Sequence, residues 1–160
     1  MKKVLLAFFA ILACTQSFAQ CNNLFYDGFE TGAFGAGWAL AGPYTYAFPT
    51  AAPAVGSYNM QLTGGNTSHY NGPSVSFAPT QSTYISYRVN TTNISTPNCY
   101  FVIGDASTNS NNGILFNYVT AGNLRFYSGA LGDYTMPITT NTWYHVEIMN
   151  INYTTKTYDV

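Results

Sequence analysis

Short runs of alternating apolar and polar residues, separated by turn-forming residues, most limit the folds open to this chain. Apolar residues take every second position in Tyr84–Val89, and the same alternation returns in Thr142–Asn150. Alternate side chains of a strand point to opposite faces, so each run would bury one face and expose the other. No segment keeps the 3.6-residue repeat of an amphipathic helix. The pattern predicts an all-β domain with inward-facing Ile85, Tyr87, Val89, Tyr144, Val146 and Ile148.

Turn residues divide the rest of the chain into further short strands. The segment Ala39–Gly56 holds three prolines and is expected to be a loop, as are the polar stretches Thr91–Asn98 and Asp105–Gly113. Strands spaced this way, without helices between them, favour an antiparallel β-sandwich. The predicted strands are Leu24–Phe29, Tyr58–Leu62, Val75–Phe77, Tyr84–Val89, Tyr100–Ile103, Ile114–Tyr118, Leu124–Tyr127, Thr142–Asn150 and Tyr153–Val160. The last run reaches the end of the sequence without a turn, so we expect a sandwich truncated at its C-terminus.

The first nineteen residues have the layout of a secretory signal peptide. A basic start, Met1–Lys3, precedes the apolar run Val4–Ala13, and Ser17-Phe18-Ala19 supplies small residues for cleavage before Gln20. Residues 1–19 would then be removed, leaving one domain over residues 20–160 that is secreted or held at the cell surface. The alternative is a lipoprotein signal with Cys14 as the lipidated residue.

The charge balance beyond residue 19 argues against several classes of partner. Only three basic residues stand against six acidic ones, a net charge of −3. Three scattered cations cannot form a basic patch, so we expect no nucleic-acid partner. Charged residues make up 7% of the whole chain and aromatic residues 17%, whereas ordinary domains are about 25% charged. A surface of Asn, Thr, Ser and Gly suits an extracellular β-protein without a membrane span.

Two cysteines, Cys21 and Cys99, remain in the predicted mature chain. In an oxidising compartment they could form one disulfide. Two independent thiols, or one bond to another molecule, are the alternatives that the sequence leaves open.

Two motifs resemble those of a known family. The first is Phe25–Gly32 followed by Gly37-Trp38, and the second is Asn141–Ile148 followed by Thr157–Val160. In this order they resemble the concanavalin A-like (laminin G-like) lectin and glucanase jelly roll. The first motif is also similar to the opening of β-sandwich carbohydrate-binding modules, and the signal peptide and composition resemble secreted proteins of Bacteroidota. The resemblance implies a jelly roll, a fold that carries lectins, hydrolases, lyases and adhesion modules.

Acidic residues do not form the pattern of a glycoside hydrolase. Such an enzyme needs two carboxylates on opposite sides of the scissile bond. Glu147 is the only acidic residue of its predicted strand, and Asp27 and Glu30 would face opposite ways on an extended segment. We therefore assign no catalytic residue, and a catalytic strand beyond Val160 is the alternative.

A structural calcium site is the one metal hypothesis. The resemblance implies that the first and last strands share such a site. Asp27, Glu30 and Asp159 are the candidate carboxylates, because Ca²⁺ takes oxygen ligands from carboxylates, carbonyls and water. The alternative is that Asp27 and Glu30 are solvated turn residues, or that Glu30 caps nearby amides.

Aromatic side chains on polar strand faces are candidates for sugar binding. Trp and Tyr rings stack on the C–H faces of sugars, and a few polar groups orient the hydroxyls. The predicted ligand-binding residues are Trp143, His145, Tyr84, Arg88, Tyr44 and Tyr46. The alternative is that Trp143 packs in the core or between the sheets.

The sequence thus predicts a non-catalytic extracellular module that binds glycans or acts in cell-surface adhesion, with a glycan or cell-surface polysaccharide as partner and further domains in the same polypeptide. A polysaccharide-degrading enzyme and a purely structural secreted module are the alternatives.

Overall fold

The computed structural model describes residues 23–64, 72–78, 80–95, 100–104, 115–126 and 133–160. These ranges contain β-strands and turns and no helix, which confirms the all-β prediction. The strands are β1 (Trp38–Leu40), β2 (Thr45–Ala47), β3 (Gln61–Thr63), β4 (Pro73–Val75), β5 (Ile85–Val89), β6 (Tyr100–Ile103), β7 (Leu115–Thr120), β8 (Asn123–Phe126), β9 (Tyr134–Pro137), β10 (Tyr144–Asn152) and β11 (Thr157–Asp159).

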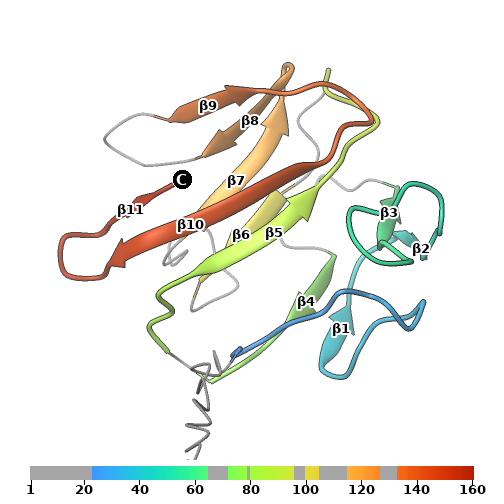
Figure 1. The fold of residues 1–160 in the computed structure, drawn as a ribbon, viewed down its shortest axis with the longest axis horizontal. Coiled ribbons are helices and arrows are strands. Elements are labelled where there is room, and N and C mark those ends of the chain that lie inside the picture. Colours follow the sequence, from blue (N-terminus) through green and yellow to red (C-terminus); the bar gives the residue numbers. More distant parts are fainter. Residues whose placement is uncertain (1–22, 65–71, 79, 96–99, 105–114, 127–132) are drawn as a thin grey trace, which may run out of the picture.

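Two larger antiparallel sheets form the body of the molecule. One has the strand order β6-β7-β8-β9, and the other has the order β11-β10-β5. Two small sheets, β1-β4 and β2-β3, lie to one side of them (Figure 1). The nine-residue β10 crosses the whole molecule and is the longest strand described.

The hydrophobic core lies between the two larger sheets. Its most buried side chains are Leu124 of β8, 1% exposed, and Ile148 of β10, which is fully buried. Tyr87 of β5 also stacks on Phe101 of β6, with ring centroids 3.9 Å apart. This pair of rings joins the two sheets at a second point. Burying a large apolar side chain contributes about 1.5–3 kcal/mol, which makes this layer the main source of stability. Two sheets with one shared apolar layer are compatible with a β-sandwich.

Alternation along the chain places side chains as predicted on the two long strands. In β5 the odd-numbered residues are half-buried, and Ser86 and Arg88 between them are exposed. In β10 the side chains of Val146 and Ile148 are buried, whereas His145 is exposed. The predicted inward faces of these two strands are therefore confirmed.

The β7–β8 hairpin has a two-residue turn at Ala121 and Gly122. Both residues have positive φ, 47° and 79°, the conformation of a type I′ turn. The Gly122 N–H donates to the Ile94 carbonyl over 2.7 Å, and the Gly122 carbonyl accepts from the Ile138 N–H over 2.9 Å. The turn therefore also fastens the two segments that hold Ile94 and Ile138.

Three features of the described chain differ from the sequence prediction. Leu24–Phe29 forms no strand, because the Asp27 carboxylate binds backbone amides that a strand would use (see below). The expected loop Ala39–Gly56 contains the end of β1 and all of β2, and β2 pairs only with β3 and so tolerates nearby prolines at a sheet edge. The strand β9 was not predicted, since Tyr134–Pro137 ends in proline and lies at the edge of its sheet.

Other predicted strands correspond to observed ones with shifted ends. Tyr58–Leu62 and Val75–Phe77 overlap only the short β3 and β4. Tyr153–Val160 shortens to β11, because residues before it form a turn in which the Asn152 Oδ1 accepts from the N–H groups of Thr154 and Thr155. The predicted loop Asp105–Gly113 lies outside the described residues.

Candidate functional site

The solvent-facing side of the β5 and β10 pair brings together three predicted ligand-binding residues and two further polar residues. Antiparallel pairing sets Arg88 opposite His145 and Ser86 opposite Glu147. Directly opposed side chains share one face of a sheet, with Cβ atoms about 4.5–5.5 Å apart. We call this surface the β5–β10 outer face; it consists of Tyr84, Ser86, Arg88, His145 and Glu147.

Tyr84 and Glu147 are joined on this face. The Tyr84 hydroxyl donates to the Glu147 Oε1 over 2.6 Å, although the two residues are 63 positions apart in the chain. A hydrogen bond from a hydroxyl to a charged carboxylate is stronger than a hydrogen bond between two neutral groups. Tyr84 remains 47% exposed, so the bond orients an aromatic ring that is open to solvent.

Arg88 and His145 supply the other polar groups of the face. Both side chains are exposed, and they stand directly across the strand pair. The guanidinium offers several donors in a fixed plane, and a neutral imidazole offers one donor and one acceptor. Alternation in the sequence predicted which face of its own strand each residue occupies. Only the register between β5 and β10 shows that Arg88 and His145 stand opposite each other.

Trp143 lies just before β10 and ties a distant loop to the sheet. Its indole Nε1–H donates to the Ala52 carbonyl over 2.9 Å, across 91 positions of sequence. Ala52 has a positive φ of 49°, so the loop adopts a strained backbone at this contact. The half-buried indole has therefore used its only donor, and only its ring surface is left for a ligand.

Tyr44 and Tyr46 belong to a different sheet from the β5–β10 outer face. Tyr46 lies in β2, its ring centroid is 5.3 Å from that of Phe34, and its buried hydroxyl has no hydrogen-bond partner within the described ranges. Tyr44 precedes β2 and lies against Gly64. The structure thus does not join these two tyrosines to the other four predicted ligand-binding residues.

Asp27 organises the N-terminal part of the described chain. Its Oδ1 accepts from the Phe29 N–H over 2.7 Å, and its Oδ2 accepts from the Gly35 N–H over 3.0 Å and the Trp38 indole N–H over 2.7 Å. Around it the aromatic rings contact one another at centroid distances of 5.1 to 6.1 Å. This aromatic cluster consists of Phe25, Phe29, Phe34, Trp38, Tyr46 and Phe48.

The three predicted calcium ligands occupy separate hydrogen-bond networks. The Glu30 Oε2 accepts from the Ser57 N–H over 2.8 Å, and the Asp159 Oδ2 accepts from the Asn150 side-chain amide over 2.7 Å. In the part of the chain that the structure describes, no three His, Cys, Asp or Glu side chains gather as a metal site would require. Glu30 caps a backbone amide, which the sequence left open as an alternative, and Asp27 binds backbone amides as well, which the sequence did not predict. A calcium role for these residues stays a prediction.

Several predictions fall on residues outside the described ranges. These are the signal peptide over residues 1–19, the lipidated Cys14 and the pairing of Cys21 with Cys99.

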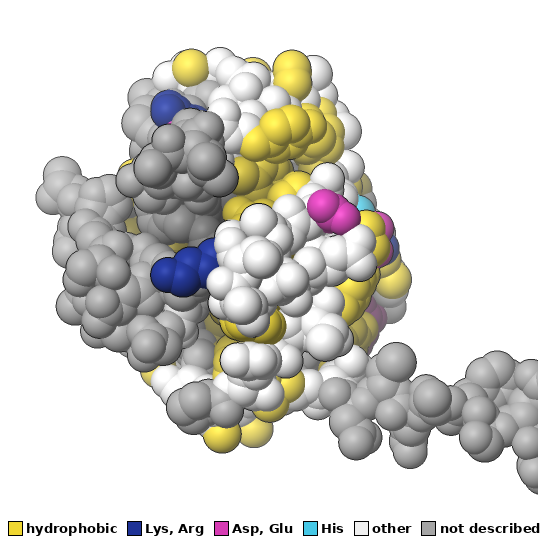
Figure 2. Space-filling model, turned by 90° about the vertical axis from the view of Figure 1, so that its left-hand side faces the viewer, with side chains coloured by type: hydrophobic (Ala, Val, Ile, Leu, Met, Phe, Trp, Pro, Cys, Tyr) yellow, Lys and Arg dark blue, Asp and Glu magenta, His cyan; other side chains and the backbone are white. Residues whose placement is uncertain are grey.

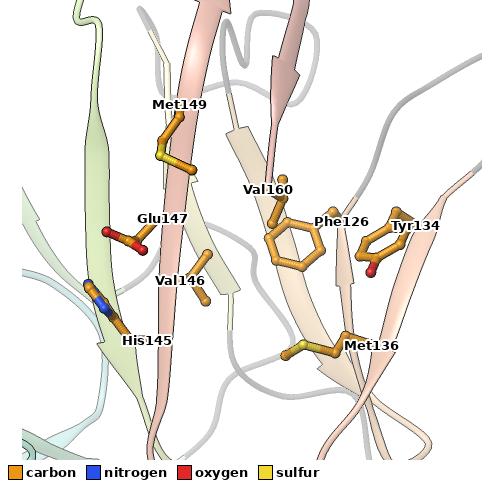
Figure 3. A pocket seen from close by; sticks show the side chains of 8 residues that line it. All are labelled: Phe126, Tyr134, Met136, His145, Val146, Glu147, Met149 and Val160. Atoms are coloured by element: carbon orange, nitrogen blue, oxygen red, sulfur yellow. The ribbon is translucent and has the colours of Figure 1, made fainter.

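A pocket of about 180 Å³ lies beside β10, at the side away from β5. Figure 3 shows Val146 pointing from β10 toward Phe126 and Met136, whereas His145 and Glu147 lie on the other side of the strand. Figure 2, which faces the end where β10 turns into β11, shows hydrophobic side chains in a band with acidic side chains beside it. The sequence did not predict this pocket, because its residues come from β8, β9, β10 and the residue after β11 and share no local pattern.

Comparisons of the chain with protein-family models, with curated proteins and with solved structures found no match. Within the described residues, no helix is long and apolar enough to cross a membrane.

Proposed function

We propose that this chain is a non-catalytic extracellular module, a β-sandwich of the concanavalin A-like jelly-roll type, that binds glycans through the β5–β10 outer face. The observation that carries the proposal is the hydrogen bond from Tyr84 to Glu147, which holds an exposed aromatic ring in place beside polar side chains. An oriented ring costs little conformational entropy when a ligand binds, because its rotamer is already restricted.

The chemistry of the face suits a sugar. The Tyr84 ring offers a flat apolar surface for the C–H face of a pyranose. Arg88 and His145 can donate to hydroxyl groups, and the Glu147 carboxylate can accept from them. One guanidinium and one carboxylate on the same face give little net charge, which favours a neutral glycan over a polyanion.

The same face offers little to a hydrolytic mechanism. Glu147 is the one carboxylate on the β5–β10 outer face, and a hydrolase needs a second about 5–5.5 Å or about 6.5–9.5 Å away. Binding without cleavage therefore agrees better with these residues. A polysaccharide-degrading enzyme and a purely structural module are the competing functions.

Titration calorimetry with soluble neutral polysaccharides tests the proposal, using Tyr84→Ala beside the wild type. We expect Tyr84→Ala to weaken binding about three- to tenfold, because a stacked ring contributes about 0.5–1.5 kcal/mol beyond its buried area. Tyr84→Phe keeps the ring but loses the bond to Glu147, so its affinity should fall between the two.

Thr154→Ala is the matched control. Thr154 is exposed in the turn between β10 and β11, outside the β5–β10 outer face, and should leave affinity unchanged. If the wild type binds none of the neutral polysaccharides, or if Tyr84→Ala binds as tightly as the wild type, glycan binding at this face is refuted. Reducing sugars released during the incubation would instead support the enzyme.

A further inference from the structure

The row of outward side chains on β10 continues past the β5–β10 outer face to Trp143. Tyr144 is half-buried and packs against the core cluster. Alternation therefore turns its two neighbours, Trp143 and His145, to the solvent side of the sheet. The row that faces solvent thus begins with an indole ring.

Tyr84 lies at the other end of the same face. Ile85 is paired with Ile148, so the next outward pair along the two strands is Tyr84 and Met149. Both are exposed, at 47% and 41%. The Tyr84 hydroxyl reaches diagonally to Glu147, which places its ring beside β10 between Glu147 and Met149. The face therefore ends in an aromatic ring on this side as well.

The two rings are far apart along the strands. Glu147 and Met149 are four and six residues from Trp143, which at about 3.3 Å per residue separates the rings by about 13–20 Å. One sugar ring stacks on one aromatic ring and cannot reach both. We call this surface the outer strip. The polar side chains between its two rings are Arg88, Ser86 and His145.

The indole at one end of the outer strip is held in place. The Trp143 N–H donates to the Ala52 carbonyl, so the ring is oriented before a ligand arrives and loses less conformational entropy on binding. Figure 1 shows β5 and β10 in front of β6 and β7, and no other described strand crosses in front of them. A ligand can therefore lie along both strands from one ring to the other.

We propose that the outer strip binds an internal stretch of a linear, β-linked, neutral polysaccharide that lies along β5 and β10. This inference rests on the proposed glycan-binding function and adds the shape and direction of the ligand. One sugar stacks on Trp143 and another, in the same chain, stacks on Tyr84. The sugars between them form hydrogen bonds with Arg88, Ser86 and His145. An extended chain reaches both rings, whereas a coiled α-linked chain curves away from the strip.

Oligosaccharide length tests the proposal by titration calorimetry. The probes are the β-1,4-linked cellohexaose and mannohexaose, each beside its disaccharide, cellobiose or mannobiose. We expect at least one hexasaccharide to bind about tenfold or more tightly than its disaccharide, because a chain held at one ring brings a second sugar to the other ring at high effective concentration. The five overlapping disaccharides of a hexasaccharide would by themselves give only about a fivefold gain.

Maltohexaose is the matched control, because it has the glucose units of cellohexaose in α-1,4 linkage. It should bind at least about fivefold more weakly than the better β-linked hexasaccharide. The variants Trp143→Ala and Tyr84→Ala should each weaken binding of that hexasaccharide about three- to tenfold.

Nuclear magnetic resonance of the wild type reports on both rings without any substitution. The better β-linked hexasaccharide should shift the ring signals of Tyr84 and the indole signal of Trp143. The indole of Trp38 is the internal control, because it binds Asp27 within the aromatic cluster and should not shift.

Three results would overturn the extended site and leave glycan binding at Tyr84 intact. They are a gain of about fivefold or less from disaccharide to hexasaccharide, equally tight binding of maltohexaose, and an unshifted Trp143 indole. Binding of a neutral polysaccharide but of neither β-linked hexasaccharide would overturn it as well. Loss of all binding, to polysaccharides and oligosaccharides alike, would instead refute the proposed function on which the inference rests.

Discussion

At the scale of single residues, Asp27 is the side chain on which most local structure depends. Its carboxylate accepts three hydrogen bonds from groups two, eight and eleven positions away. Two of the donors, the N–H groups of Gly35 and Trp38, meet at the same oxygen, Oδ2. This explains why the opening acidic and aromatic motif forms a compact loop and not the strand that its composition predicts.

Replacing Asp27 with asparagine tests this role. Asparagine keeps one acceptor oxygen, but its amide nitrogen would set a donor against at least one of the three N–H groups that now bind the carboxylate. We expect Asp27→Asn to lower the free energy of unfolding by about 1–3 kcal/mol, the cost of leaving such a donor unsatisfied. Urea unfolding followed by tryptophan fluorescence measures the change.

Asp159→Asn is the control for that experiment. The Asp159 carboxylate makes an exposed hydrogen bond to Asn150, so its loss should cost less than about 0.5 kcal/mol. Equal effects of the two substitutions would mean that Asp27 has no special role in the N-terminal loop.

At the scale of elements, the strands fall into two groups. The strand β5 and the part of β10 from Tyr144 to Ile148 alternate and bury one face, so the local pattern predicted their orientation, although β10 begins and ends two residues later than predicted. The three-residue strands β1 and β2 bury no continuous face, and their pairing with β4 and β3 depends on segments far along the chain. No local rule would find them.

The β7–β8 hairpin carries a turn residue that is not optimal. Ala121 takes a φ of 47°, a left-handed conformation in which alanine is strained and asparagine or glycine is not. Its own backbone conformation is set by the hairpin register, which pairs Thr120 with Asn123. We expect Ala121→Asn to stabilise the protein by about 0.5–1 kcal/mol, measured by urea unfolding.

Ala33→Asn is a suitable comparison, since Ala33 is also exposed but does not have a positive φ. It should change stability by less than about 0.5 kcal/mol. A destabilised Ala121→Asn protein would show that the turn does not hold the type I′ conformation.

At the scale of the whole molecule, β11 joins the C-terminal residues to the shared core. Tyr158 is half-buried and packs against the cluster that includes Ile148. Burial raises the pKa of the Tyr158 phenol above its ordinary value of 10.0, because desolvation penalises the phenolate. Tyr158 therefore makes the stability of the fold depend on pH in the alkaline range.

The direction of that dependence follows from proton binding. Well below pH 10.0 Tyr158 is protonated in both the folded and the unfolded chain, and its contribution to stability is complete. As the pH rises past this value the unfolded chain loses the proton first, so stability falls until the pH exceeds the pKa of the folded state. Tyr158→Phe removes this loss.

Urea unfolding of both proteins across pH measures the effect. The difference in unfolding free energy, wild type minus Tyr158→Phe, should stay constant up to about pH 9 and then decrease. Parallel curves through the alkaline range would contradict a buried phenol.

The sequence by itself determined that this chain is all-β, that β5 turns its odd-numbered residues inward and β10 turns Tyr144, Val146 and Ile148 inward, and that its charges cannot form a basic patch. Each of these follows from period, composition or alternation, which are local properties. Tertiary structure alone decided that His145 stands opposite Arg88, that Tyr84 binds Glu147, that Asp27 holds a loop, and that residues of β8, β9 and β10 line a pocket. These depend on register and on contacts between residues that lie up to 91 positions apart, because a strand face states which side chains point outward but not which strand lies beside it.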